Sequence, residues 1–391
     1  MNIRAFLVAL FSIIWYTMGM KTSVAKDFDK ADRYEGGKIH RLWRELEQGM
    51  FPFMMNEVGE LTEKNRLFVA VCEAVVEPES FAYAKWKGVG RPPSDRMAIF
   101  KAFLYKSVHD VPTTKELVER LRLEPQGRRL CGWTWPEDVP CEAKFSEANG
   151  EFAVRGFSDG WFDGFVRAFV GGDGRKSVCY DSAPMPVRAK AANRKRVLEE
   201  LDPDQPEPGN RLGWQLWQDA DTALAELPQD CDWGTKRDAH GKPRHWKGGK
   251  VHAAVTDDGI PVAIAYTSAS LHDSQAFIPL MRKATDRVPH VHDLADAAYD
   301  SWTVVASSVM EGNEPVIDCN RRRAGDAPKM TAAEREDYKA RGNDERFFAH
   351  LIDAHGGRHV RVREPRKVWQ HLMYGVLVIA VEQALRSMML C

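Results

Sequence analysis

The strongest constraint on the fold is the order of apolar patterns after Ser177. Short apolar runs typical of β-strands alternate there with longer amphipathic segments typical of helices, in the order strand, hairpin, helix, strand, helix, strand, helix. The hairpin is clearest at residues 250–268, where two apolar runs surround Asp257-Asp258-Gly259. This order predicts an α/β fold in which a mixed sheet is flanked by helices. Ligand sites in such folds gather at strand ends and at the termini of neighbouring helices.

The preceding segment, residues 26–170, has helical patterns instead. The run DRMAIFKAFLYKSVH at 95–109 places four apolar side chains on one stripe, and TTKELVERLRLEP at 113–125 begins with a capping-box pattern. Two helices joined by a short turn are typical of a DNA-reading helix-turn-helix, in which the helix at 114–122 would recognise sequence. From the pattern alone, a plain helical bundle is the favoured interpretation. Both interpretations predict an all-α N-terminal domain.

Composition restricts the classes of partner. The 391 residues are enough for two or three structural units. The 55 basic and 56 acidic residues leave a net charge of −1, so any surface for nucleic acid has to be local. The seven cysteines form no C-x-x-C pair, which argues against a disulfide framework or a cysteine zinc site. The apolar run at 372–381 is shorter than a membrane span and predicts a buried helix, so no membrane partner is expected.

Residues 1–25 conflict with a cytosolic protein. They combine Arg4, an apolar run at 6–16 and a Ser23-Val24-Ala25 step, which together resemble a secretory signal peptide. The alternative is a spurious N-terminal extension, because Met18 and Met20 are possible start residues just before the polar sequence resumes.

Three carboxylates occupy positions suited to metal chemistry. Asp181 ends the first predicted strand, Asp296 ends the fourth, and Glu345 lies on the helix after the fifth. Carboxylates from distant parts of a chain can jointly hold Mg²⁺ ions for phosphoryl transfer. An Asp at a strand end is also a common turn or cap residue. Asp293 and Asp300 flank Asp296 and are rival ligands, although on a strand Asp293 would point to the opposite face.

Residues 338–348, YKARGNDERFF, join these acids to a known pattern. Tyr338, Arg341 and Glu345 have the spacing Y-x2-R-x3-E, which would place them on one face of an α-helix. This spacing resembles the signature of DDE-class transposases from bacterial insertion sequences. Further segments resemble the same family in the same order: GRPPSDRMAIFKAFLYKSVHDVPTTKELVERLR at 90–122, YDS at 180–182, KGGKVHAAVTDDGIPVAIAYTSASLHDS at 247–274, DAAYDS at 296–301 and KVWQHLMYGVLVIAVEQALR at 367–386.

The resemblance implies a ribonuclease-H-like catalytic domain at 175–391, after a helical DNA-binding or oligomerisation domain at 26–170. It implies that Asp181, Asp296 and Glu345 are catalytic and hold two Mg²⁺ or Mn²⁺ ions. The expected activity is cleavage of DNA at transposon ends, followed by strand transfer to target DNA. Terminal inverted repeats and target DNA are therefore the expected partners, and the protein is expected to form a homo-oligomer on DNA.

If the chain is a transposase of this kind, several basic side chains become candidate DNA contacts. Arg341 is expected to contact phosphate rather than to pair with Glu345, and Tyr338 either contacts DNA or packs a helix on the sheet. Two basic clusters flank the candidate acids and are expected to contact phosphates: Arg321, Arg322 and Arg323, and Arg194, Lys195 and Arg196. A third basic segment, at 358–367, is better interpreted as a solvated face.

The sequence departs from the family pattern in two places. The longer signature continues to a lysine where this chain has Ile352, and residues 200–245 look like an insertion of unknown role. Three rival functions remain: a DNA-binding relic without catalysis, a metal-dependent nuclease of the same fold, and an exported hydrolase. A chromosomal DNA substrate favours the cytoplasm, in the nucleoid, and hence a mis-assigned start for residues 1–25.

Overall fold

The structure is a computed structural model that describes residues 60–85, 93–171, 175–192, 211–237, 241–320 and 330–390. The leader-like segment 1–25 and the basic clusters at 194–196 and 321–323 lie outside the described residues.

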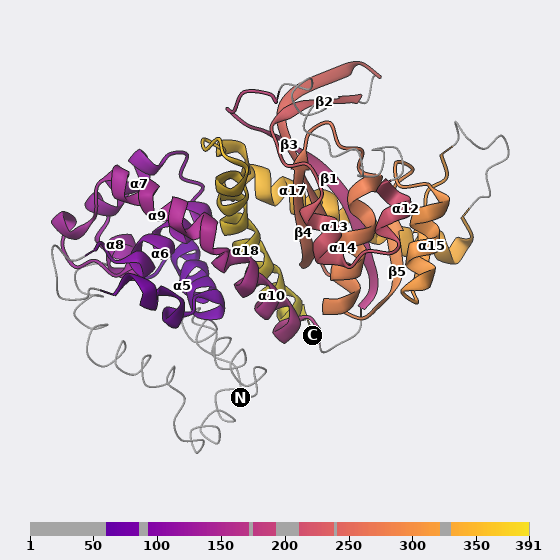
Figure 1. The fold of residues 1–391 in the computed structure, drawn as a ribbon. Coiled ribbons are helices and arrows are strands. Elements are labelled where there is room, and N and C mark those ends of the chain that lie inside the picture. The colour runs from indigo at the N-terminus through magenta and orange to yellow at the C-terminus, as the bar shows by residue number, and fades with distance from the viewer. Residues whose placement is uncertain are drawn as a thin grey trace, which may run out of the picture.

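The first half of the described chain is helical (Figure 1). Its helices are α5 (Glu63–Val75), α6 (Arg96–Val108), α7 (Thr114–Leu123), α8 (Pro125–Cys131), α9 (Glu142–Arg155) and α10 (Phe157–Phe169), with 3-10 turns η2 (Pro78–Ala84) and η3 (Pro136–Asp138). The predicted N-cap of α7 is confirmed, because the Thr113 hydroxyl accepts the Glu116 N–H at 3.0 Å. Helix α6 is buried along most of its length, whereas α7 exposes Lys115, Glu119 and Arg122. Both the helix-turn-helix and the bundle interpretations remain open.

The second half forms a six-stranded mixed sheet, as the apolar patterns predicted. The strands are β1 (Arg175–Pro186), β2 (Asp232–Arg237), β3 (Pro243–Thr256), β4 (Pro261–Ser268), β5 (His290–Ala295) and β6 (Glu314–Ile317). Their order is β2-β3-β1-β5-β6, with β4 also paired to β3. Strand β1 is central: it runs antiparallel to β3 and parallel to β5.

Helices cover both faces of this sheet. One group consists of α12 (Arg211–Gln215), α13 (Ala220–Ala225), α14 (Ser274–Arg287) and α15 (Trp302–Met310), in which α14 contacts β3 and β4. The other consists of α16 (Ala332–Tyr338), the 3-10 turn η5 (Lys339–Arg341) and α17 (Gly342–Asp353), and α17 contacts β1 and β3. A mixed sheet flanked by helices, after a helical region, confirms the predicted fold class.

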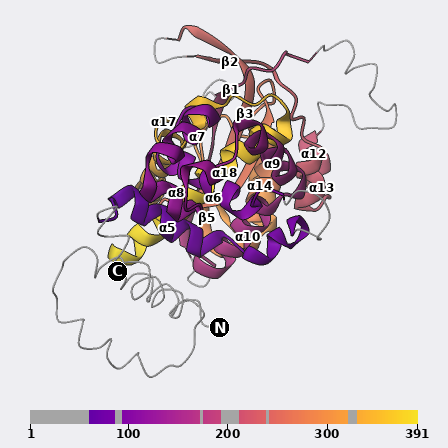
Figure 2. The ribbon, with the colours of Figure 1, turned by 90° about the vertical axis from the view of Figure 1, so that its left-hand side faces the viewer.

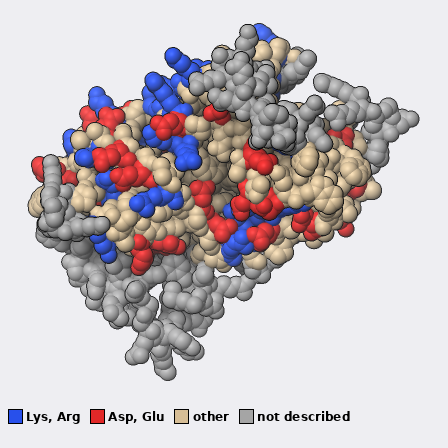
Figure 3. Space-filling model, in the orientation of Figure 1, with Lys and Arg blue, Asp and Glu red and all other residues tan. Residues whose placement is uncertain are grey.

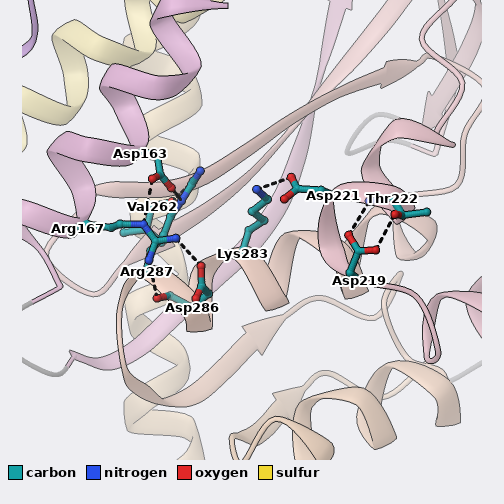
Figure 4. A network of polar contacts seen from close by, with 9 residues as sticks. All are labelled: Asp163, Arg167, Asp219, Asp221, Thr222, Val262, Lys283, Asp286 and Arg287. Atoms are coloured by element: carbon teal, nitrogen blue, oxygen red, sulfur yellow. Dashed lines mark hydrogen bonds and ion pairs between the residues drawn. The ribbon is translucent and has the colours of Figure 1, made fainter.

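The segment predicted to be an insertion, 200–245, is partly built into this fold. Its described part supplies α12, α13 and the edge strand β2. The Arg282 guanidinium of α14 donates to three backbone carbonyls at the end of α12 and just after it, those of Gln215, Leu216 and Gln218, at 2.7, 3.0 and 2.5 Å. Lys283 also pairs with Asp221 of α13 at 2.5 Å (Figure 4). The described residues 211–237 therefore pack as part of the sheet-containing half.

The C-terminal helix α18 (Pro365–Leu390) packs on both halves of the protein. It contacts α5, α6, α9 and α10 on one side and α17 and β4 on the other, and the helical region lies in front of it in Figure 2. The Tyr374 ring contacts Phe100 and Phe103 of α6, with centroids 5.1 and 5.2 Å apart. The predicted boundary between 26–170 and 175–391 stays a prediction, but the last helix of the second segment packs in the core of the first.

Among the described helices, α18 alone has the length and the apolar composition that a membrane span would need. In the protein, 78% of its apolar window is buried against other elements. The structure thus agrees with the buried helix that the short apolar run predicted.

Charged side chains join α10 to the end of α14, as Figure 4 shows. Arg287 donates to the Asp163 carboxylate at 2.8 Å and to the Val262 carbonyl at 2.7 Å. Arg167 pairs with both Asp163, at 3.0 Å, and Asp286, at 2.5 Å. These contacts, like α18, attach the helical region to the sheet.

Candidate active site

Strand register brings two distant acids together. Strands β1 and β5 are parallel neighbours, and Tyr180 of β1 pairs with Ala295 of β5. The next residue on each strand is an acid: Asp181 within β1 and Asp296 directly after β5. The register therefore places Asp181 and Asp296 beside each other, although 114 other residues separate them in the sequence.

Arg341 lies between these two carboxylates. Its Nη2 is 3.2 Å from Asp181 Oδ2 and 3.7 Å from Asp296 Oδ2. Burial raises the pKa of the Asp181 carboxyl, and the Arg341 charge opposes that rise. Burial would lower the pKa of Arg341, but the surrounding acidic groups outweigh it, so the guanidinium stays charged. Within the described residues Arg341 pairs with Asp181 and Asp296, and its expected contact with a DNA phosphate stays a prediction.

The third predicted acid is placed differently from the first two. Tyr338, Arg341 and Glu345 do not share one α-helix, because α16 ends at Tyr338, residues Lys339–Arg341 form a 3-10 turn, and α17 begins at Gly342. The prediction of one continuous helical face is therefore wrong. Glu345 is exposed, and its carboxylate makes no hydrogen bond or ion pair within the described parts of the chain.

The neighbouring residue, Asp344, points into the acidic cluster and was missed by the sequence analysis. Its side chain is 0% exposed, and its Oδ2 lies 4.0 Å from Arg341 Nε with no hydrogen-bond partner. Burial and the Asp181 charge raise the pKa of Asp344 to about 7, against the opposing effect of Arg341. The signal that would have found it is helical: Asp344, Phe347, Phe348 and Leu351 form the buried stripe of α17, and Glu345 lies off it.

Replacing Asp344 with Asn is expected to stabilise the metal-free protein at alkaline pH. Because the folded pKa is raised, wild type has its full stability below the unfolded pKa of 3.8 and loses stability as pH rises through about 7. Asp344→Asn removes that loss, so its free energy of unfolding should exceed that of wild type by up to about 4 kcal/mol near pH 8 and match it near pH 4. Urea unfolding in EDTA measures both values.

The adjacent exposed Glu345→Gln is the matched control for Asp344→Asn, with an expected change within about 0.5 kcal/mol at either pH. A gain from Asp344→Asn that is equal at both pH values would contradict the role assigned to the buried charge.

Tyr338 packs on the sheet. Its hydroxyl donates to the Ala295 carbonyl at 3.3 Å, and its ring joins the apolar cluster of Cys179, Leu294 and Val316. The structure thus favours packing over DNA contact, the two alternatives left open for this residue. Arg341 lies 5.9 Å from the centre of the Tyr338 ring, so this packing also helps to place the guanidinium.

The rival acids have other partners. Asp293 is buried on the opposite face of β5, as predicted, where its carboxylate accepts from Tyr180 at 2.8 Å and His290 at 2.7 Å. Asp300 accepts the backbone N–H of Asn320 at 2.7 Å. Asp296 also acts as a turn residue, because it accepts the Ala298 N–H at 2.8 Å. Of these three acids, Asp296 is the one beside Asp181.

An ion pair beside β1 was also not predicted from the sequence. Lys250 of β3 donates to the Asp273 carboxylate and to the Leu271 carbonyl, both at 2.8 Å. Lys250 pairs in register with Pro184, three residues after Asp181. The predicted structural role of His252 agrees with the structure: it is buried and bonds to Thr267 at 2.8 Å, and burial lowers its pKa to about 4.

The residues present fit a hard divalent cation. Asp181 and Asp296 each place an oxygen within 3.7 Å of Arg341 Nη2. The two carboxylates are therefore close enough to interact with one positive charge between them. The buried, unpartnered Asp344 Oδ2 adds a third carboxylate oxygen beside them. An all-oxygen donor set is the type that Mg²⁺ and Mn²⁺ prefer.

Two family models match the chain. One, described as a transposase DDE domain, matches residues 215–381, which include Asp296, Arg341 and Glu345. The other, described as transposase domain DUF772, matches residues 57–149. Both matched segments are therefore similar to domains of transposases. Comparisons with curated proteins and with solved structures found no match.

The mixed sheet with its flanking helices is consistent with a ribonuclease-H-like DDE domain. Its match begins after β1, so Asp181 joins the other acids through strand pairing rather than through the matched segment. The DUF772 domain covers α5 to α9 up to residue 149. The family implies a DNA-processing enzyme, DNA binding and a divalent metal.

Proposed function

We propose that the protein is the DNA transposase of an insertion sequence, which cleaves DNA strands at the element's ends and joins them to target DNA. The observation that carries this proposal is the pairing of β1 with β5, which sets Asp181 and Asp296 on either side of one cationic group. We assign Asp181, Asp296 and Glu345 as the catalytic acids and the ligands of two Mg²⁺ or Mn²⁺ ions.

The proposed chemistry uses these residues to hold and neutralise charge. Bound Mg²⁺ would supply activation of the attacking oxygen and stabilisation of the leaving oxygen. Water attacks the phosphodiester, the bond from phosphorus to O3′ breaks, and the freed 3′-hydroxyl then attacks a target phosphodiester. In the metal-free protein Arg341 neutralises Asp181 and Asp296. With cations bound there, its guanidinium becomes available to a DNA phosphate.

The test is a reaction of the full chain with a duplex that contains an end of the element. A transposase should nick that duplex in Mg²⁺ and join it to a second duplex, and should ignore a random duplex of the same length. Nicking without joining would identify a nuclease of the same fold. Binding without nicking would identify an inactive relic. Because the substrate is chromosomal, we also place the protein in the cytoplasm as a homo-oligomer on DNA.

A described basic surface adjoins this site. The segment of residues 358–367 begins in η6 (Gly357–His359), which contacts β1, and runs into the start of α18. Arg361, Arg363 and Arg366 are all exposed and form no ion pair within the described residues. Figure 3 shows Lys and Arg gathered around this end of α18. We infer that DNA leaves the active site over this segment, for which the sequence had favoured a solvated face.

Changing Arg361, Arg363 and Arg366 together to Gln is expected to weaken binding to all DNA sequences alike. The slope of log affinity against log salt should flatten by about 0.9 for each phosphate that the protein no longer neutralises. Fluorescence anisotropy at several salt concentrations measures this slope.

The matched control for these arginines is Arg358→Gln, because Arg358 is exposed in the same segment but already pairs with Asp353. An unchanged slope in the triple variant would exclude this segment from the DNA path.

A further inference from the structure

A cluster of metal-ligating side chains lies at the other end of α17, away from Asp344. It consists of His350 on α17, His355 just after that helix, and Glu382 on α18. One ligand atom from each of the three residues lies within 4.8 Å of the other two. These residues have no role in the phosphodiester cleavage proposed at Asp181 and Asp296, so they form a separate cluster.

The tautomer of His355 is set by a backbone contact. Its Nδ1 lies 3.2 Å from the Ser107 carbonyl oxygen of α6, so Nδ1 carries the proton and donates. The Ser107 hydroxyl donates in return to the His355 carbonyl at 3.1 Å. In the neutral ring the lone pair is therefore on Nε2. A histidine whose other nitrogen is held by a carbonyl is the usual arrangement of a metal ligand.

Glu382 presents an oxygen to that lone pair. Its Oε1 accepts from Arg386 at 2.6 Å, whereas its Oε2 is buried without a hydrogen-bond partner. Oε2 lies 3.5 Å from His355 Nε2. Two groups that both offer lone pairs repel each other at this distance unless a cation or a proton lies between them.

His350 completes the group from the third side. It is half-buried, and within the described residues neither of its ring nitrogens has a hydrogen-bond partner. Its ring stands edge-on to that of His355, with centroids 6.2 Å apart. Ligand atoms around a tetrahedral zinc ion at about 2.0–2.1 Å lie roughly 3.3 Å from one another. The His355–Glu382 spacing already approaches that value, and a small rotation of His350 would complete it.

We propose that His350, His355 and Glu382 bind one divalent transition-metal ion, with Zn²⁺ as the expected ion and water as its fourth ligand. Two imidazoles and one carboxylate suit zinc rather than magnesium, because Mg²⁺ prefers an all-oxygen shell. The ion joins α17, which carries Glu345, to α18, which packs on the helical region. Its role is structural, since it fixes the catalytic helix relative to the DUF772 domain.

The experiment uses the full chain, stripped with a chelator and returned to buffer that contains Mg²⁺ and a slight excess of Zn²⁺. Zinc that remains after gel filtration is measured by mass spectrometry, and Co²⁺ is substituted to read the site by its visible absorption. Wild type should keep about one zinc per chain and give the intense cobalt spectrum of a tetrahedral site. His350→Ala and Glu382→Gln should each bind zinc at least about tenfold more weakly.

Two control variants test whether the retained zinc is bound by this cluster. His359→Ala removes a nearby histidine that pairs with Asp110 at 3.7 Å, and it should keep the zinc. Asp181→Asn should keep it too, because it alters only the catalytic carboxylates. The proposal is overturned if wild type holds no more zinc than His350→Ala, or if the zinc disappears in Asp181→Asn.

Thermal unfolding supplies a second readout, which does not depend on the amount of zinc that survives gel filtration. Zinc should raise the melting temperature of wild type over its value in EDTA and leave that of His350→Ala unchanged. If Glu382→Gln lowers the melting temperature equally with zinc and with EDTA, His355 and Glu382 form an ordinary ion pair and the metal site is rejected.

Discussion

Glu345→Gln is expected to abolish Mg²⁺-dependent nicking of a duplex that contains the element's end. The substitution keeps the size of the side chain and removes its charge, so it tests the metal role rather than packing. We expect nicking to fall by at least about 10²–10³-fold, the range found when one preorganised charge-stabilising group is removed. DNA binding should stay intact or strengthen, because a negative charge near phosphate is gone. Binding is measured in Ca²⁺, so that cleavage does not interfere.

Asp181→Asn and Asp296→Asn should behave in the same way. Both carboxylates lie within 3.7 Å of the Arg341 guanidinium, so either substitution removes half of the pair that faces the expected cation. Calorimetric titration with Mn²⁺ should show weaker metal binding in both variants. This gives a readout that does not depend on catalysis.

Asp344→Asn is the matched control for Glu345→Gln, because the two acids are adjacent on α17. Asp344 is buried beside Arg341 whereas Glu345 is exposed, so the structure alone places Asp344 nearer the other acids. If Glu345 is the third catalytic acid, Asp344→Asn should retain substantial nicking. The reverse outcome, with nicking abolished in Asp344→Asn and kept in Glu345→Gln, would transfer the role to Asp344.

Much of the catalytic core follows from the sequence because local patterns encode it. Asp181 and Asp296 each follow a buried apolar run, and parallel pairing of those runs is enough to bring the acids together. The hairpin at 250–268 was equally clear, because two apolar runs surround a turn sequence.

Other features were missed because tertiary contacts decide them. Strand β2 has the sequence DWGTKR, which lacks apolar alternation, and pairing with β3 makes it an edge strand. The break of α16 and α17 by a 3-10 turn has no proline to signal it. Asp344 was not predicted because it is adjacent to Glu345, the acid that matches the family signature. Only the buried stripe of α17, which includes Asp344 and excludes Glu345, distinguishes the two acids.

The largest effect on stability is expected from Asp293→Ala. The Asp293 carboxylate is fully buried and accepts from Tyr180, His290 and Asn313, at 2.8, 2.7 and 3.1 Å. His290 Nδ1 donates to the Val288 carbonyl at 2.9 Å, and Nε2 faces the Asp293 carboxylate. The hydrogen bond and charge of Asp293 raise the pKa of His290, which favours a buried imidazolium beside the carboxylate. Removing the carboxylate leaves the buried His290 charge unpaired and takes away the acceptor of the Tyr180 hydroxyl, whereas the Asn313 amide keeps its bond to Thr285 Oγ1 at 3.0 Å. The expected cost is about 3–5 kcal/mol in the free energy of unfolding.

The pH dependence of this cost has a definite sign. Burial lowers the pKa of His290, but the hydrogen bond and charge of Asp293 outweigh it, so the net shift is upward from 6.5. A raised folded pKa means that the stabilisation is complete below the unfolded pKa and is lost as pH rises through the folded value. Asp293→Ala should therefore cost more near pH 6 than near pH 9 in urea unfolding. A cost that grows with pH would contradict a charged His290.

Asp293 and Asp296 together separate stability from catalysis on one strand. Asp293 faces Tyr180, whose ring packs 4.7 Å from Phe277 of α14, whereas Asp296 faces Arg341 on the other side of the sheet. Asp293→Asn, which keeps the shape and one acceptor, should fold with reduced stability and retain substantial nicking. Asp296→Asn should unfold like wild type and not nick. If Asp293→Asn instead abolished nicking while keeping wild-type stability and Mn²⁺ affinity, the buried network would act on the reaction itself, and Asp293 would be more than a support for the register of β1 and β5.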